Sequence, residues 1–153
     1  MPTLTASTIV GGAWKSLYDI LTGSSGITDP KSRGLARTKW VMPAFPDINK
    51  SDFPGYPIIV MVVDESFKPY LFNRQGRDIR VSYMITIFAD KNEHVDTLSD
   101  DILNIVTTLQ STMEGYKLFN PTLTSTSTTT EFRSPEDKIH MKTLFIDYEV
   151  QSL

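Results

Sequence analysis

The chain has 153 residues and no cysteine, which excludes disulfides, thiolate nucleophiles and zinc sites built on thiolates. Its 15 Lys and Arg against 18 Asp and Glu give a net charge of −3, the opposite of the basic excess of a DNA-coating protein. A hydrophobic content of 40% with 22% charged residues is typical of a globular chain. No apolar run approaches the roughly 18 residues that span a bilayer, and Met1–Val10 lacks the pattern of a signal peptide. We therefore expect a soluble intracellular protein in which residues 1–153 form a single domain.

The first element with a clear period is a helix over Ser7–Leu21. Its apolar residues fall three or four positions apart, which places them on one helical face: Val10, Trp14, Leu17 and Leu21. The connection that follows begins with a loop over Thr22–Gly34, rich in glycine and serine. A short strand is then predicted over Leu35–Met42, and the proline-rich stretch Ala44–Pro57 is expected to be irregular.

Two strands are predicted in the middle of the chain. Tyr56–Val63 is a continuous apolar run, which indicates a strand covered on both faces, and Phe67–Phe72 extends it into a hairpin with a turn at Asn73–Gly76. Arg77–Ala89 alternates apolar and mixed residues over a length that belongs at the centre of an antiparallel sheet. The side chains expected to point inward are Ile79, Val81, Tyr83, Ile85 and Ile87.

A second helix over His94–Met113 has the strongest helical spacing in the chain, formed by Leu98, Ile102, Ile105 and Leu109. Leu118–Phe132 contains the run TLTSTSTTT, which fits either an exposed strand or a flexible loop; we favour the strand because threonine favours sheets. Ile139–Val150 is the last strand. The expected fold class is α+β, a mainly antiparallel sheet with two helices packed on one face and long loops.

No group of residues predicts catalysis or a cofactor. The two histidines, His94 and His140, are far from any serine motif, and no G-x-S-x-G elbow is present. Asp96 and Asp100 share a helical face near His94, but acidic residues early in a helix are explained by the helix dipole. Asp64 and Glu65 are adjacent in a strand and so point to opposite faces. We expect no enzyme activity, no metal and no cofactor.

The basic positions Lys31, Arg33, Arg37 and Lys39 precede Trp40 and form the clearest positive cluster. Basic charge beside an aromatic ring is one pattern of nucleic-acid binding. The alternative, which we favour, is a solvated loop or the rim of a protein interface.

The order of these segments resembles the tail terminator (tail completion) proteins of long-tailed bacteriophages. The resemblance spans nearly the whole chain and begins with the N-terminal helix Ser7–Leu21. The other matching segments are DFPGYPIIVMVV (Asp52–Val63), RDIRVSYMITIFAD (Arg77–Asp90), EHVDTLSDDILNIVTTL (Glu93–Leu109) and LFIDYEV (Leu144–Val150).

The resemblance implies a structural virion protein, assembled in the host cytoplasm, that forms a hexameric ring on the head-proximal end of the tail tube. Such a ring stops tube polymerisation and offers the docking surface for head–tail joining. Its partners would be other copies of itself, the tail tube protein and the head-completion or connector protein. DNA would pass through the lumen without specific binding, and no membrane is involved. The alternatives are another neck or tail-tube component, or a small nucleic-acid-binding module.

Interface residues are expected in two places. The first is the loop Asp64–Arg77, where Phe67, Tyr70 and Phe72 are candidate anchors with Arg74 beside them, because aromatic residues are enriched in interface cores. The second is the loop that carries Lys31, Arg33 and Arg37.

Overall fold

The computed structural model describes residues 9–69, 77–126, 128–134 and 137–150. Helices and strands follow in the order α1 (Ile9–Thr22), the 3₁₀ turn η1 (Arg37–Lys39), β1 (Val41–Met42), β2 (Ile58–Pro69), β3 (Arg77–Ala89), α2 (Asn92–Thr108), α3 (Gln110–Gly115), β4 (Leu118–Ser125), β5 (Thr129–Ser134) and β6 (Asp137–Val150).

The strands form one six-stranded sheet with the order β1-β2-β3-β6-β4, and β5 also pairs with β6. All pairs are antiparallel except the short parallel contact of β1 with β2. β3 lies between β2 and β6, as its length and alternation predict. The fold is thus α+β with a mainly antiparallel sheet, which confirms the expected class.

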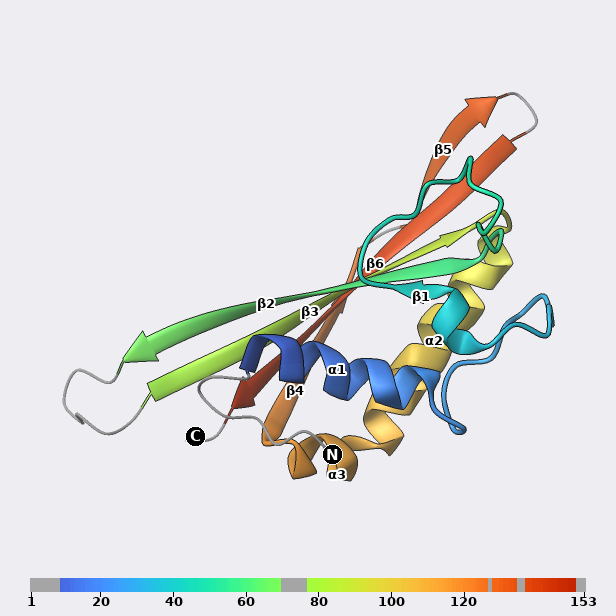
Figure 1. Cartoon of the computed structure of the whole chain (residues 1–153). Helices are drawn as coiled ribbons and strands as arrows, with labels where there is room; N and C mark the ends of the chain where they lie inside the picture. Colours follow the sequence, from blue (N-terminus) through green and yellow to red (C-terminus); the bar gives the residue numbers. More distant parts are fainter. Residues whose placement is uncertain (1–8, 70–76, 127, 135–136, 151–153) are drawn as a thin grey trace.

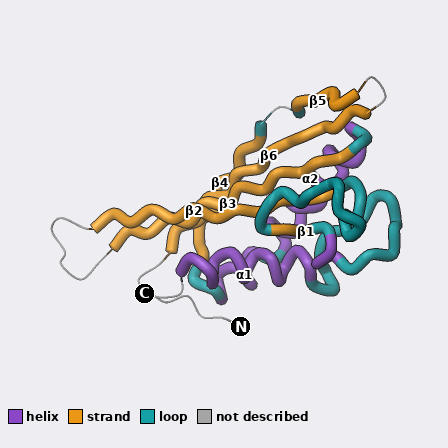
Figure 2. Tube along the Cα trace, turned by 45° about the horizontal axis from the view of Figure 1, so that its top comes forward, coloured by secondary structure: helices purple, strands orange, loops and turns teal. Residues whose placement is uncertain are grey.

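The helices α1 and α2 cover the same face of this sheet (Figures 1 and 2). Leu17 and Leu21 of α1 and Leu98 and Ile102 of α2 are fully buried. The sheet contributes every second residue of β3 and β6 to the same core: Val81, Tyr83, Ile85, Ile87, Leu144, Ile146, Tyr148 and Val150. The apolar side chains at every second strand position and those on one face of each helix therefore form a single apolar layer, as the sequence pattern predicts.

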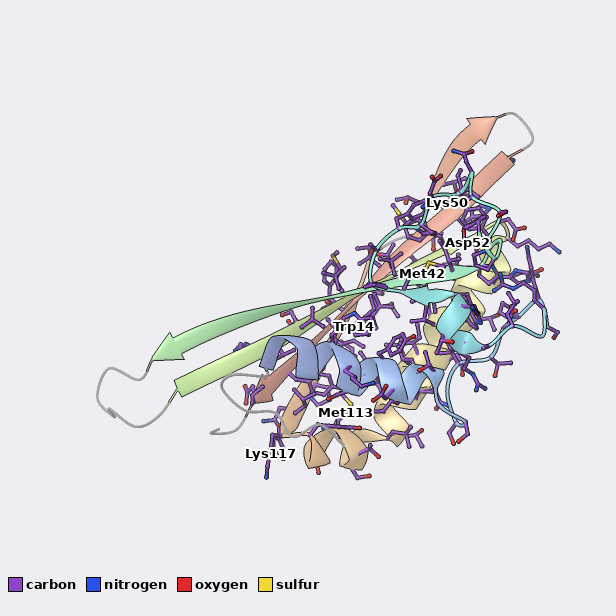
Figure 3. The ribbon with its side chains drawn as sticks, viewed as in Figure 1. Trp14, Met42, Lys50, Asp52, Met113 and Lys117 are labelled. Atoms are coloured by element: carbon purple, nitrogen blue, oxygen red, sulfur yellow. The ribbon has the colours of Figure 1, made fainter. Side chains whose placement is uncertain are left out.

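Two aromatic side chains tie α1 to the sheet through polar atoms. Trp14 points from α1 toward the sheet (Figure 3), and its indole N–H donates to the carbonyl of Met61 at 2.7 Å. The buried Tyr83 hydroxyl donates to the carbonyl of Ala13 at 2.6 Å. Burial raises the pKa of the Tyr83 phenol well above its ordinary value, and the neighbouring Tyr148 ring adds to this effect. Each tyrosine therefore stays neutral in the core.

Three expectations from the sequence are wrong in detail. Most of the predicted strand Leu35–Met42 is a loop and the turn η1, and only Val41–Met42 pair with β2. The predicted helix His94–Met113 ends at Thr108, and the chain turns at Leu109 into the separate short helix α3. The run Tyr56–Val63 is covered on both faces only as far as Met61, because Val62 is 40% exposed.

The Thr-rich segment forms strands, as favoured. β4 and β5 both lie against β6, with β4 pairing along Leu144–Val150 and β5 along Asp137–Met141. Between them, Thr126 bonds to Thr143: its backbone N–H donates to the Thr143 carbonyl at 2.9 Å, and its hydroxyl accepts the Thr143 N–H at 3.0 Å. The Thr126 hydroxyl thus takes the place of a backbone carbonyl acceptor at the point where β4 ends and β5 has not yet begun. Within the described residues, no helix combines the length and hydrophobicity needed to cross a membrane.

Candidate functional site

The hairpin of β2 and β3 is the first candidate contact surface. Its strands pair without interruption from Ile58 opposite Phe88 to Pro69 opposite Arg77. The far end of the hairpin extends beyond both long helices (Figures 1 and 2). No helix among the described residues covers this end (Figure 1), and a ribbon of strands without a covering helix gains little stability from its own packing. The projecting end is therefore suited to contacts with another molecule.

The segment predicted as the loop Asp64–Arg77 belongs to strand β2 as far as Pro69, so the loop prediction is wrong there. Phe67 lies in β2, where its backbone pairs with that of Ile79. Tyr70, Phe72 and Arg74 lie outside the described residues. Their interface role stays a prediction.

The face of the sheet opposite the helices is the second candidate surface. Val62 of β2 and Met84 of β3 are direct neighbours across the strands, and each is 40% exposed. Phe145 of β6 pairs with Met84 on its other side, which completes an apolar row across three strands. We call Val62, Met84 and Phe145 the open-face row. The sequence alone did not single it out, although the alternation in β3 already placed Met84 on the mixed face.

Polar pairs flank the open-face row: Thr86 and Thr143 are next to it on one side, and Arg80 and Glu149 lie on the other side beyond Ser82 and Asp147. The hydroxyls of Thr86 and Thr143 lie 3.2 Å apart, and the Arg80 guanidinium lies 3.7 Å from the Glu149 carboxylate. Farther along the face, Phe45 from the proline-rich stretch packs edge-on against Phe88, with ring centroids 4.9 Å apart. An apolar centre with a polar border is the usual anatomy of a protein contact surface.

The connection between α1 and β2 holds the predicted basic cluster, on a different part of the molecule from the hairpin end (Figures 1 and 2). Arg33 is bound within the chain: its Nε donates to Asp29 Oδ2 at 2.7 Å, and its two Nη groups donate to the carbonyls of Gly55 and Pro57, each at 2.9 Å. Its guanidinium also lies 5.5 Å from the centroid of the Trp40 ring. Arg33 thus joins the two ends of the long connection.

Asp29 is the anion at the centre of this network. Its carboxylate accepts the Arg33 side chain and the backbone N–H groups of Lys31 and Arg33. Burial by itself would raise the pKa of Asp29, but these hydrogen bonds outweigh the burial and lower the pKa below its ordinary value. Asp29 is therefore ionised near neutral pH, with three N–H donors on its carboxylate.

Two more residues of the basic cluster, Arg37 and Lys31, also have partners inside the chain. Arg37 donates through Nε to the carbonyl of Ile27 and through Nη1 to the carbonyl of Gly23, the latter at 2.7 Å. Lys31 pairs with Asp90 at the end of β3. Lys31, Arg33 and Arg37 therefore hold the connection in place, and an interface role for these three residues stays a prediction.

The same connection forms an open hollow of about 370 Å³ beside β1. Met42, Lys50 and Asp52 are among its lining residues and are labelled in Figure 3. Its rim carries both charges, with Lys39 and Lys50 against Asp47 and Asp52. Within the described ranges, no three His, Asp or Glu side chains gather closely enough to hold a metal ion.

Comparison with known proteins gives a fold relationship. No family model matches the chain, and neither does any curated protein. The chain is similar in structure to a chain of a solved structure described as the virion of native gene transfer agent (GTA) particle. The TM-score is 0.55 at 11% sequence identity, and the match covers 94% of this chain and 98% of the other. The two chains share a fold over nearly their full lengths.

Proposed function

We propose that this protein is a non-catalytic structural component of a phage-like virion. More specifically, we propose that it is a tail terminator: a single domain of residues 1–153 that forms a ring on the head-proximal end of the tail tube. The ring stops tube polymerisation and presents the docking surface for the head connector. A ring follows when one surface of each copy binds a different surface of the next copy and the rotation closes.

The observation that carries the proposal is the shared fold with a chain of the GTA virion, because the match leaves almost no part of either chain unaccounted for. The order of the sequence elements supports the narrower assignment to a tail terminator. The projecting hairpin and the open-face row also fit an assembly subunit, because both offer contact area that the helices do not cover. Phe67, Tyr70, Phe72 and Arg74 would lie in the hairpin contact.

The decisive experiment mixes the purified protein with tail tube protein and examines the sample by negative-stain electron microscopy and mass measurement. A terminator binds tube ends as a single ring, and tubes assembled in its presence stop growing. Long tubes formed by this protein alone would identify a tube subunit instead. A strict monomer that leaves tube ends bare would refute the proposal.

A pair of variants tests the contact surface separately. Met84→Glu places a charge in the open-face row, whereas Asn104→Glu places the same charge on the exposed side of α2. We expect Met84→Glu to abolish binding to tube ends with an unchanged circular dichroism spectrum, and Asn104→Glu to bind normally. Equal binding by both variants would exclude the open-face row from the interface but leave the terminator role intact.

The nucleic-acid alternative has a specific weakness. Arg33 and Arg37, which should contact phosphates in that case, direct their donors at carbonyls and at Asp29 within the chain. A nucleic-acid module must show DNA affinity that falls steeply with salt. A gel shift at low salt tests this directly, and we expect no shift.

A further inference from the structure

The apolar run Ile58–Val63 of β2 lies at one edge of the sheet. It has no charged residue, proline or glycine, which is the composition of segments that stack into β-sheets between molecules. One side of the run pairs with β3 along its whole length, whereas on the other side β1 pairs only with Ile59 and Val60. An unpaired edge of such a run is a template for a strand of another chain. The outer side of β2 therefore needs a cover.

The backbone hydrogen bonds show which groups of the run face outward. The N–H of Ile59 donates to the carbonyl of Trp40 at 2.8 Å, so the backbone of Ile59 is directed away from β3. These directions alternate along a strand, and the backbone groups of Met61 therefore face outward too. The Met61 carbonyl is the first outward-facing acceptor beyond β1. If β1 continued in the same register, the N–H of Ala44 would donate to this carbonyl.

The indole of Trp14 takes the place of that donor. It reaches from α1 toward the sheet (Figure 3), and its N–H donates to the Met61 carbonyl at 2.7 Å. The ring is held by stacking on Tyr18 of the same helix, with centroids 4.4 Å apart. A side chain satisfies the carbonyl without presenting a new row of backbone groups, so the sheet ends here. Beyond Val63, β2 has three charged residues and ends at Pro69, a composition that discourages edge pairing.

We propose that Trp14 guards the edge of β2. Together with β1 it closes the outer side of the apolar run as far as Met61, and so keeps a second copy of this chain from adding a strand there. Without the indole N–H, the free edge would extend from the charged end of β2 into the apolar run. The guard acts at the edge of the sheet, and the inference does not depend on the proposed ring.

The test compares two variants of the full chain that each remove one hydrogen bond between α1 and the sheet. Trp14→Phe removes the bond at the edge, and Tyr83→Phe removes the bond from the Tyr83 hydroxyl to the Ala13 carbonyl, on the inner strand β3. Aggregation is followed by thioflavin T fluorescence under conditions in which each protein is folded by circular dichroism. We expect Trp14→Phe to aggregate about tenfold faster than wild type, because the loss of one hydrogen bond favours the open edge by about that factor. Tyr83→Phe should aggregate at the wild-type rate.

A second pair of substitutions, made in the Trp14→Phe background, identifies the segment that aggregates. Val62→Lys adds a charge to the exposed face of the run and should restore the wild-type rate, because a charge opposes stacking of the segment. Asn104→Lys adds the same charge on the exposed side of α2 and should leave aggregation fast. The proposal is overturned if Trp14→Phe aggregates no faster than wild type, if Tyr83→Phe aggregates equally fast, or if Asn104→Lys restores the rate as well as Val62→Lys does. If Trp14→Phe fails to fold, 3-benzothienylalanine at position 14 gives the same comparison, because it keeps the two-ring shape without an N–H.

Discussion

Replacing Arg33 by alanine should destabilise the protein strongly, although Arg33 lies in a loop. The side chains of Arg33 and Asp29 are only 15% and 10% exposed, so water screens them poorly and each charge depends on the other for neutralisation. Removing one partner of a buried ion pair costs about 3–5 kcal/mol because the other charge is left uncompensated. Asp29 keeps its two backbone donors, whereas the carbonyls of Gly55 and Pro57 lose theirs. We therefore expect the lower end of that range, about 3 kcal/mol.

The assay is urea unfolding followed by tryptophan fluorescence. With a urea dependence of about 2 kcal/mol per M, the midpoint should fall by about 1.5 M for Arg33→Ala. Lys15→Ala, which removes the exposed pair of Lys15 with Asp19, is the control and should change stability by less than about 0.5 kcal/mol. If Arg33→Ala also stays within about 0.5 kcal/mol of wild type, the network does not hold the connection.

The pH dependence gives a second measurement on the same network. The pKa of Asp29 is lower in the folded state than its ordinary value, so its contribution to stability is present above that ordinary value. The contribution is lost as the pH falls through the folded pKa. Asp29→Asn should therefore be less stable than wild type near neutral pH and should show a weaker loss of stability on acidification. Parallel acid profiles for the two proteins would contradict the assignment.

Further predictions concern close packing and the buried phenols. Gly26→Ala should destabilise by more than about 2 kcal/mol, because the added methyl carbon would lie 2.1 Å from the carbonyl oxygen of Leu21. Gly115→Ala, where nothing lies within 4 Å, is the control and should be neutral in thermal unfolding. Burial raises the pKa values of Tyr83 and Tyr148, so ultraviolet titration of the six tyrosines should show these two phenols ionising only well above pH 10 or on unfolding. The folded state should lose stability as the pH rises past about 10, and uniform titration of all six would contradict the burial.

The sheet and the long helices were predictable because their signals are local. Arg77–Ala89 was predicted with the observed bounds, since a period of two over that length is compatible with few other structures. The helix over Ser7–Leu21 was placed within two residues of its observed start and one of its end. In both cases one apolar face of the element decides its position in the core.

The connection was harder to predict because its structure depends on contacts between distant residues. Leu35–Met42 has the composition of a strand, but Arg37 is held by carbonyls 10 and 14 residues earlier in the chain. The periodicity of apolar residues cannot predict a hydrogen bond between a side chain and a distant backbone carbonyl. For the same reason, the basic cluster suggested an external partner, whereas the structure shows internal acceptors. The open-face row was missed because the continuous apolar run Tyr56–Val63 does not show at which residue the second face of β2 becomes exposed. Val62 is part of that run and is exposed.

The position of β6 in the sheet has a consequence for folding kinetics. β2 and β3 can pair early as a local hairpin. The pairing of Ile85 of β3 with Leu144 of β6 forms later, because Leu144 follows 59 residues further along the chain. Pairing across such a separation is slow because a long loop must close first. Until β6 arrives, one edge of β3 is an unpaired strand rich in isoleucine and valine, and β4 and β5 have no strand to join. Substitutions in β6 that slow its docking should therefore lower the yield of folded protein through aggregation more than they lower its equilibrium stability.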